Sequence, residues 1–134
     1  DVWSVTSYKE LRKDILEVAR WNMLNTGAAP REAFVTQCLK NEPGPVVAAS
    51  DYMKLLPDAL GQAIPQRLVA LGTNGFGRSE SRKMLREFFE VDARWIAFAT
   101  LHGLYLDGKI EEGVVKQAMK TLEIDPDKAN PMTS

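Results

Sequence analysis

The sequence predicts an α/β protein with a mostly parallel sheet flanked by helices. Two short apolar runs, Pro45–Ala49 and Arg67–Leu71, lack the alternation of a half-exposed strand, which is typical of parallel strands covered on both faces. Segments with apolar residues at helical spacing lie between and after these runs, as the crossover connections of a parallel sheet require. With an opening strand at Val2–Thr6 the sheet has three strands. This number is small for such a fold, so we expect part of the sheet to lie upstream of residue 1.

The first helix is predicted to begin after Ser7. The stretch Ser7-Tyr-Lys-Glu10 is a capping box, in which a hydroxyl and a carboxylate each satisfy a free amide at a helix start. The apolar stripe of this helix consists of Leu11, Ile15 and Val18. We expect the helix to end near Asn25–Gly27.

Two further helices are expected before the last strand. The first is short and carries Pro30 in its first turn, where a missing N–H costs little. Its apolar face consists of Phe34, Val35, Cys38 and Leu39. The other is expected to be capped by Asp51, and Pro57 must lie in its first turns or bend it.

Three helices are predicted after the last strand. Ser79 is expected to cap the first of them and Asp92 the second, which Gly108 closes. The third carries Val114, Val115, Ala118, Met119 and Leu122 on one side. The polar tail, residues 125–134, is expected to be loosely held.

Composition limits the classes of function. With 134 residues, of which 45% are hydrophobic, we expect a single domain spanning residues 1–134. The formal net charge of −1 arises from 17 basic and 18 acidic residues, so neither nucleic acid nor a membrane surface is an expected partner. The lone cysteine, Cys38, has no partner for an internal disulfide, which favours a cytoplasmic location.

The glycine-rich stretch Leu71–Arg82 has the composition of a phosphate-binding loop. A Walker loop requires a lysine after its second glycine, and Arg78 stands there instead. The spacing of the glycines also departs from the dinucleotide-binding pattern. Helix N-terminal amides after Ser79 could still hold an anion.

A purely structural interpretation of the same stretch is favoured. Asn74 and Gly75 would adopt positive φ in a tight turn, Gly77 would let Phe76 tuck under the sheet, and Ser79 would cap the helix. The residues that could contact an interface or an anion are Asp51, Tyr52, Asn74, Phe76, Arg78 and Ser79.

No catalytic, cofactor-binding or metal-binding residue is assigned. The only histidine, His102, lies in an apolar helix without a second imidazole or a cysteine nearby in sequence, and a half-buried packing role is expected for it. The carboxylate pairs are interpreted as solvated helix surface. These pairs are Asp14 with Glu17 and Glu111 with Glu112.

Several longer phrases, taken in order, resemble the carboxyl end of the homodimeric pyruvate dehydrogenase decarboxylase component. The phrases are Val2–Ser7, Arg20–Leu24, Pro30–Arg31, Val47–Leu55, Leu71–Ser79, Phe88–Asp92 and Ile124–Lys128. The glycine stretch alone is similar to the third domain of the broader transketolase superfamily. Asn74 stands where this family is expected to have aspartate, and Asn25 where histidine followed by proline is usual.

The resemblance implies a thiamin-diphosphate enzyme that decarboxylates pyruvate and passes the acetyl group to a lipoyl group of the acetyltransferase component. It implies that thiamin diphosphate and magnesium bind in other domains of the parent, through a Gly-Asp-Gly motif that is absent here. This chain is then expected to be a C-terminal assembly and dimer-packing domain, inactive alone, that lacks its first strand and helix. Its implied partners are the remaining domains of its own chain, a second subunit and the lipoyl acetyltransferase component. An anion-binding or effector-binding regulatory module built on Gly72–Ser81 is the alternative.

Overall fold

The computed structural model describes all 134 residues and divides them into two compact units. The first unit consists of Asp1–Pro43 and Leu55–Gln66, and the second of Gly44–Lys54 and Arg67–Ser134. The single domain spanning residues 1–134 stays a prediction. None of the helices combines the length and apolar character needed to cross a membrane.

The first unit is helical. It contains α1 (Tyr8–Leu24), α2 (Phe34–Leu39), α3 (Leu55–Asp58) and a 3₁₀ turn, η1 (Gly61–Ala63). The predicted start and end of α1 are confirmed, because the Ser7 hydroxyl accepts a hydrogen bond from the Glu10 amide at 3.2 Å and the helix stops at Leu24. The buried side chains of this unit include Ile15, Val35, Pro57, Leu60 and Ile64.

The second helix begins later than expected. It starts at Phe34 rather than around Pro30, because the Asp14 carboxylate of α1 accepts the Phe34 amide at 2.7 Å and so fixes the first turn there. This contact joins residues that are distant in sequence. A surface carboxylate thus serves as the cap of a neighbouring helix.

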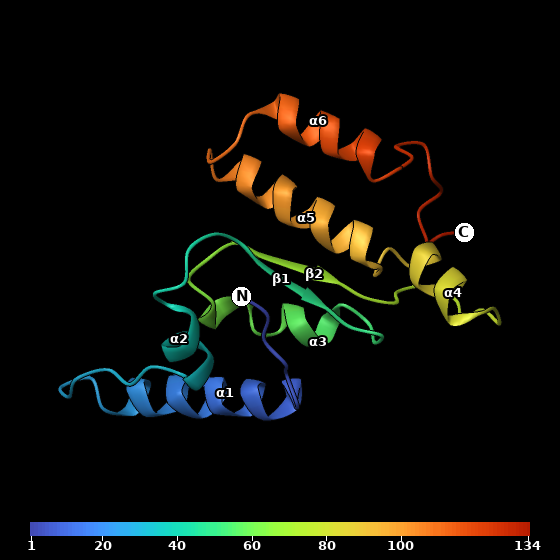
Figure 1. Cartoon of the computed structure of the whole chain (residues 1–134). Coiled ribbons are helices and arrows are strands. Elements are labelled where there is room, and N and C mark those ends of the chain that lie inside the picture. Colours follow the sequence, from blue (N-terminus) through green and yellow to red (C-terminus); the bar gives the residue numbers. More distant parts are fainter. The chain divides into compact units, whose positions relative to one another are not determined.

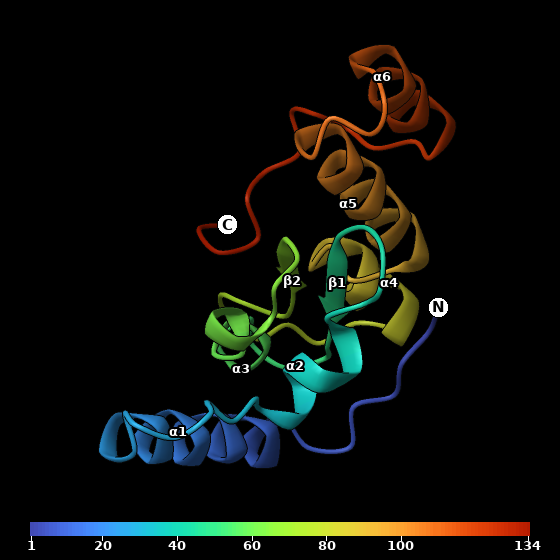
Figure 2. The same ribbon diagram turned by 90° about the vertical axis from the view of Figure 1, so that its left-hand side faces the viewer.

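The second unit contains a two-stranded parallel sheet and three helices. Its elements are β1 (Val46–Ala49), β2 (Leu68–Leu71), α4 (Arg82–Phe88), α5 (Ala93–Leu106) and α6 (Glu112–Thr121). The strands pair in the register Val46↔Leu68 to Ala49↔Leu71, which confirms the parallel α/β prediction. Helix α5 lies along both strands, and α6 packs against the other side of α5 (Figures 1 and 2).

The core of this unit lies between the sheet and α5. It consists of Leu71, Phe89, Val91 and Ala99, with Val47, Val69, Leu85, Phe88 and Ile96 packed around them. Helix α5 can approach the sheet closely because Gly103 has no side chain. A Cβ at this buried position would lie 2.9 Å from the Pro45 side chain. The Asp92 side chain caps α5 by accepting the Trp95 amide at 3.0 Å, as the sequence predicts. Gly108 follows the helix with φ +67°, also as expected.

The expected opening strand is wrong. Val2–Thr6 forms no strand, and the sheet consists of β1 and β2 only. A strand needs a neighbour for its backbone amides and carbonyls, and no segment of the sheet pairs with these residues. Val2 is fully exposed, at 102%.

Candidate functional site

The glycine stretch after β2 is fixed to the segment after β1 by close backbone contact. Gly72 is buried, and a Cβ built on it would collide with the Tyr52 carbonyl oxygen and lie 2.8 Å from the Lys54 nitrogen. The Thr73 amide donates to the Tyr52 carbonyl at 2.9 Å, and the Asn74 amide donates to the Gly72 carbonyl at 3.1 Å. Two amides that a phosphate-binding loop would aim at a ligand are therefore paired within the chain.

Asn74 joins the same two segments through its side chain. Its Oδ1 accepts the Lys54 amide at 2.7 Å, in a partly buried position. Gly75, and not Asn74, has positive φ, at +107°, so the expected positive φ of Asn74 is wrong. A Cβ on Gly75 would collide with the Pro131 carbonyl oxygen, so Gly75 also lets the tail approach.

The two residues after this turn do not behave as expected. Phe76 is 79% exposed, so its predicted position under the sheet is wrong. The core next to the end of β2 is filled by Leu71 together with Phe89, Val91 and Ala99 from later in the chain. Phe76 is not part of this core. A Cβ on Gly77 would meet nothing within 4 Å, so this glycine makes no close approach.

Helix α4 is capped by Ser81 rather than by Ser79. Ser81 has extended backbone, φ −61° and ψ 150°, and its hydroxyl accepts the Met84 amide at 3.4 Å. Ser79 lies exposed ahead of the helix and makes no side-chain hydrogen bond. The helix has seven residues and its own serine occupies one of its free amides, so an anion site after Ser79 is not supported.

Asp51 pairs with α4 and does not cap α3. Its carboxylate lies 3.7 Å from the Arg82 guanidinium and 3.4 Å from that of Arg86. The expected cap is wrong because the next residues, through Lys54, are held by the glycine stretch, which delays the helix to Leu55. Tyr52 contributes its carbonyl to that contact.

Arg78 stacks on an aromatic ring. Its guanidinium carbon lies 4.0 Å from the centre of the Phe88 ring, and the side chain forms no salt bridge. The position favours a cation–π contact. Arg78 is therefore the one basic residue of the glycine stretch without a carboxylate partner.

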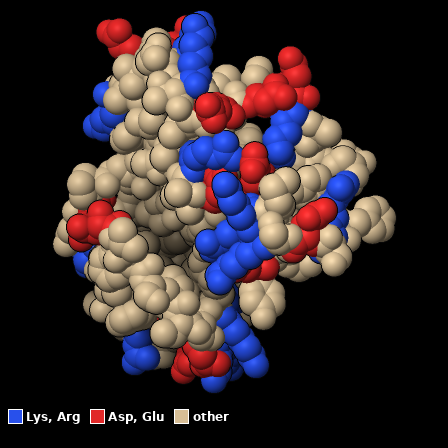
Figure 3. All heavy atoms as spheres, turned by 45° about the vertical axis from the view of Figure 1, so that its right-hand side comes forward, with Lys and Arg blue, Asp and Glu red and all other residues tan.

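A surface hollow of about 480 Å³ lies between the glycine stretch and α4. Its lining includes the apolar residues Leu85, Phe89 and Val91 together with charged residues of both signs. On the face drawn in Figure 3, lysine and arginine side chains lie among aspartate and glutamate side chains, and no broad area carries one sign. This mixture suits packing against another surface better than capture of a free anion.

The other candidate groups do not assemble into a site. No three side chains of histidine, cysteine, aspartate or glutamate converge in a way that could hold a metal ion. His102 is exposed rather than half-buried, and its ring lies between those of Phe98 and Tyr105 with centroid distances of 6.4 and 6.3 Å. It makes no hydrogen bond to a potential nucleophile or carboxylate, which leaves a catalytic role for His102 without support.

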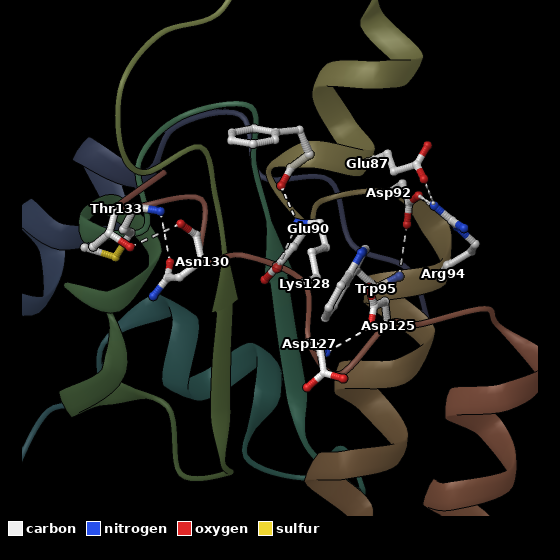
Figure 4. Close-up of polar contacts among 12 residues, drawn as sticks. Glu87, Glu90, Asp92, Arg94, Trp95, Asp125, Asp127, Lys128, Asn130 and Thr133 are labelled. Atoms are coloured by element: carbon white, nitrogen blue, oxygen red, sulfur yellow. Dashed lines mark hydrogen bonds and ion pairs between the residues drawn. The ribbon is translucent and has the colours of Figure 1, made fainter.

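Sequence reasoning missed a polar network between α4 and α5 (Figure 4). Arg94 contacts the carboxylates of Asp92 at 2.9 Å and Glu87 at 3.1 Å, and both acids raise the pKa of the guanidinium. Lys128 of the tail donates to the Phe88 carbonyl at 2.8 Å and to the Glu90 carboxylate at 3.1 Å. Only the contacts of Arg94 with Asp92 and Glu87 had a signal in the sequence, since these three residues lie within eight positions of one another.

Comparisons with known proteins agree with the resemblance described above. A family model described as a transketolase-like TK C-terminal domain matches residues 1–92. The "Pyruvate dehydrogenase E1 component" of Pseudomonas aeruginosa is 50% identical over 133 residues, which is 98% of this chain and 15% of the relative. Proteins of the same name from Cupriavidus necator and Escherichia coli K12 are 41% and 43% identical, over 99% and 98% of this chain and 15% of their own.

The chain thus spans about 15% of the length of these relatives. The fold agrees with the family match, because the second unit is a small parallel sheet flanked by helices. More than half of the chain is covered by the family model, so the chain belongs to the family of transketolase-like C-terminal domains.

Proposed function

We propose that this chain is the C-terminal part of a pyruvate dehydrogenase E1-type enzyme and that it serves interdomain and dimer packing. The observation that carries the proposal is the 50% identity, over 98% of this chain, with a relative named for that function. The parent enzyme would decarboxylate pyruvate and transfer the acetyl group to a lipoyl group. Its partners would be a second subunit and the lipoyl acetyltransferase component.

The thiamin diphosphate and magnesium of such an enzyme do not fit the residues of this chain. Magnesium needs several oxygen ligands around one point, and no such cluster of acidic side chains is present. The amides of Thr73 and Asn74 are paired with carbonyls of the same chain, so they offer no cradle for a diphosphate. We therefore assign this chain no catalytic step.

A packing role is supported by the amount of exposed apolar surface. Both units expose large apolar side chains, among them Trp3, Met23 and Phe34 in the first and Tyr52 and Phe76 in the second. Such side chains in number are typical of surfaces that another protein surface covers. The half-buried, unpaired Cys38 is compatible with the cytoplasmic location that we propose.

Activity and subunit assembly of the longer enzyme test the proposal. The enzyme is prepared with and without the part that corresponds to residues 1–134, and pyruvate-dependent acetylation of a lipoyl domain is measured together with sedimentation. We expect removal of this part to dissociate the dimer and abolish acetyl transfer. A truncated enzyme that remains dimeric and fully active would refute the packing role.

The isolated chain provides the complementary test. Calorimetry with thiamin diphosphate and magnesium should give no saturable heat, because the chain lacks the ligands for both. Binding with a micromolar dissociation constant would show that the chain takes part directly in cofactor chemistry.

A further inference from the structure

Three segments that are far apart in sequence meet at the carboxyl ends of β1 and β2, and each exposes large apolar side chains. Gly72 lies against the backbone of Tyr52 and Met53, and Gly75 lies against that of Pro131 and Met132. We name the exposed side chains of these segments the strand-end patch. The patch consists of Tyr52, Met53, Phe76 and Met132, which are 70%, 52%, 79% and 53% exposed.

The backbone beneath the patch is fixed by hydrogen bonds. Besides the contacts of Thr73 and Asn74 described above, the Thr73 hydroxyl donates to the Asp51 carbonyl at 3.0 Å. The Met132 amide donates to the side chain of Asn130 at 2.9 Å, and Asn130 is labelled in Figure 4. Pro131 is buried beside Gly75. These hydrogen bonds order the backbone next to the exposed side chains before any partner arrives, which lowers the entropy cost of docking.

The composition of the patch is that of a protein interface core with a polar rim. The patch consists of tyrosine, phenylalanine and methionine, which are among the residue types enriched in such cores. Arg78 is stacked on Phe88 without a carboxylate partner, so it can pair with an acid of the docking surface. Arg82 and Arg86 are already paired with Asp51.

The size of the patch distinguishes between a tethered partner and a free one. Its four side chains expose on the order of 500 Å² in total, given about 150–250 Å² for one large aromatic side chain. A stable complex between free proteins buries about 800 Å² on each partner. A tethered surface needs less, because the link gives it an effective concentration in the millimolar range.

We propose that the strand-end patch docks onto another domain of the same polypeptide, through an apolar surface that carries a carboxylate opposite Arg78. The inference rests on the proposed function in one respect, namely that this chain is part of a longer protein. Most of each relative lies outside the matched segment, so such a surface is available in the relatives' chains.

Methionine oxidation by hydrogen peroxide tests the docking without any substitution. The rates at Met53 and Met132 are measured by mass spectrometry in the isolated chain and in the longer natural chain, both folded. We expect both residues to react at least about tenfold more slowly in the longer chain, because docking excludes water and oxidant from them. Equal rates in the two proteins would overturn the proposal.

A pair of variants of the longer chain tests whether the docking depends on the patch. Phe76→Ala should raise the oxidation rates of Met53 and Met132 several-fold towards those of the isolated chain. Phe34→Ala is the matched control, since Phe34 is 59% exposed but lies in α2 of the first unit, and it should leave both rates unchanged. Equal effects of the two variants would refute the assignment.

A second copy of the chain is the competing occupant. It predicts that Met53 and Met132 become protected in the isolated chain as its concentration rises, and this result would overturn docking within one polypeptide. The oxidation rates do not depend on the substrate of the longer protein. Failure of the docking inference is thus distinguishable from failure of the proposed pyruvate chemistry.

Discussion

Substitution of Gly72 by alanine is expected to separate the ends of the two strands. The added Cβ would collide with the Tyr52 carbonyl oxygen and lie 2.8 Å from the Lys54 nitrogen and 3.1 Å from the Met53 carbonyl carbon. These are backbone atoms, so no side-chain rotation can relieve the collision. The segments after β1 and β2 must therefore move apart.

The cost follows from the contacts that this movement disturbs. Overpacking of a filled position costs about 1–3 kcal/mol. The hydrogen bonds from Thr73 to Tyr52 and from Lys54 to Asn74, at 2.9 and 2.7 Å, lengthen or break, and each is worth about 0.5–1.5 kcal/mol. We expect Gly72→Ala to lower the free energy of unfolding by about 2–6 kcal/mol in total.

Gly77→Ala is the matched control in the same stretch. A Cβ there meets nothing within 4 Å and the residue does not have positive φ. It should therefore be neutral or stabilise by about 0.4–1 kcal/mol through the unfolded state. Urea unfolding of the isolated chain, followed by tryptophan fluorescence, measures both variants. If Gly72→Ala unfolds within about 0.5 kcal/mol of Gly77→Ala, the packing argument fails.

Three further results are expected. Asn74→Ala should lower the free energy of unfolding by about 1–3 kcal/mol in the same urea assay, because it leaves the partly buried Lys54 amide unpaired. Asn74→Asp keeps an acceptor for this amide and should lower the free energy of unfolding by less than about 1 kcal/mol. Lys128→Met should speed amide exchange in residues 125–134 about tenfold, since it removes the hydrogen bonds that hold the tail. Lys116→Met, on the exposed face of α6, is the control. Unchanged exchange in Lys128→Met, or an equal effect of Lys116→Met, would contradict this role of Lys128. Burial raises the pKa of the Tyr8 phenol, so the free energy of unfolding should be unaffected by this group below about pH 10 and should fall as the pH rises towards the folded-state pKa. Tyr8→Phe should remove this pH dependence. An absorbance titration in which Tyr8 ionises at the ordinary value would contradict the prediction.

The features that were predictable from the sequence depend on local signals. Ser7 and Asp92 cap their helices through hydrogen bonds to residues three positions later, and such spacing is visible in the sequence. The two apolar runs form parallel strands, as their lack of alternation predicted. These signals placed the sheet and the helix that covers it.

The errors occurred where a distant segment decides the local structure. Asp51 could not cap a helix because the glycine stretch, about twenty residues later, holds the segment that follows it. Ser79 and Ser81 are equivalent as sequence signals, and only the backbone of Ser81 placed its hydroxyl on a free amide. Val2–Thr6 has the composition of a strand but no pairing partner in the sheet.

The candidate site shows the same division between local and distant effects. Sequence analysis singled out Phe76 and Arg78 but placed Phe76 under the sheet, where Phe89 and Val91 of a later segment lie instead. The contact between Lys128 and Glu90 spans 38 residues and had no sequence signal. An exposed patch built from three segments can be recognised only once the fold brings them together.

Phosphate titration of the isolated chain, followed by amide chemical shifts, addresses most directly whether the turn after β2 is architecture or a binding loop. The amide signals of Gly75, Gly77 and Ser79 should stay in place up to millimolar inorganic phosphate, since the neighbouring amides are paired internally and the arginines of α4 are paired with Asp51. Saturable shifts of these three signals at submillimolar phosphate would contradict the account and identify the stretch as an anion site.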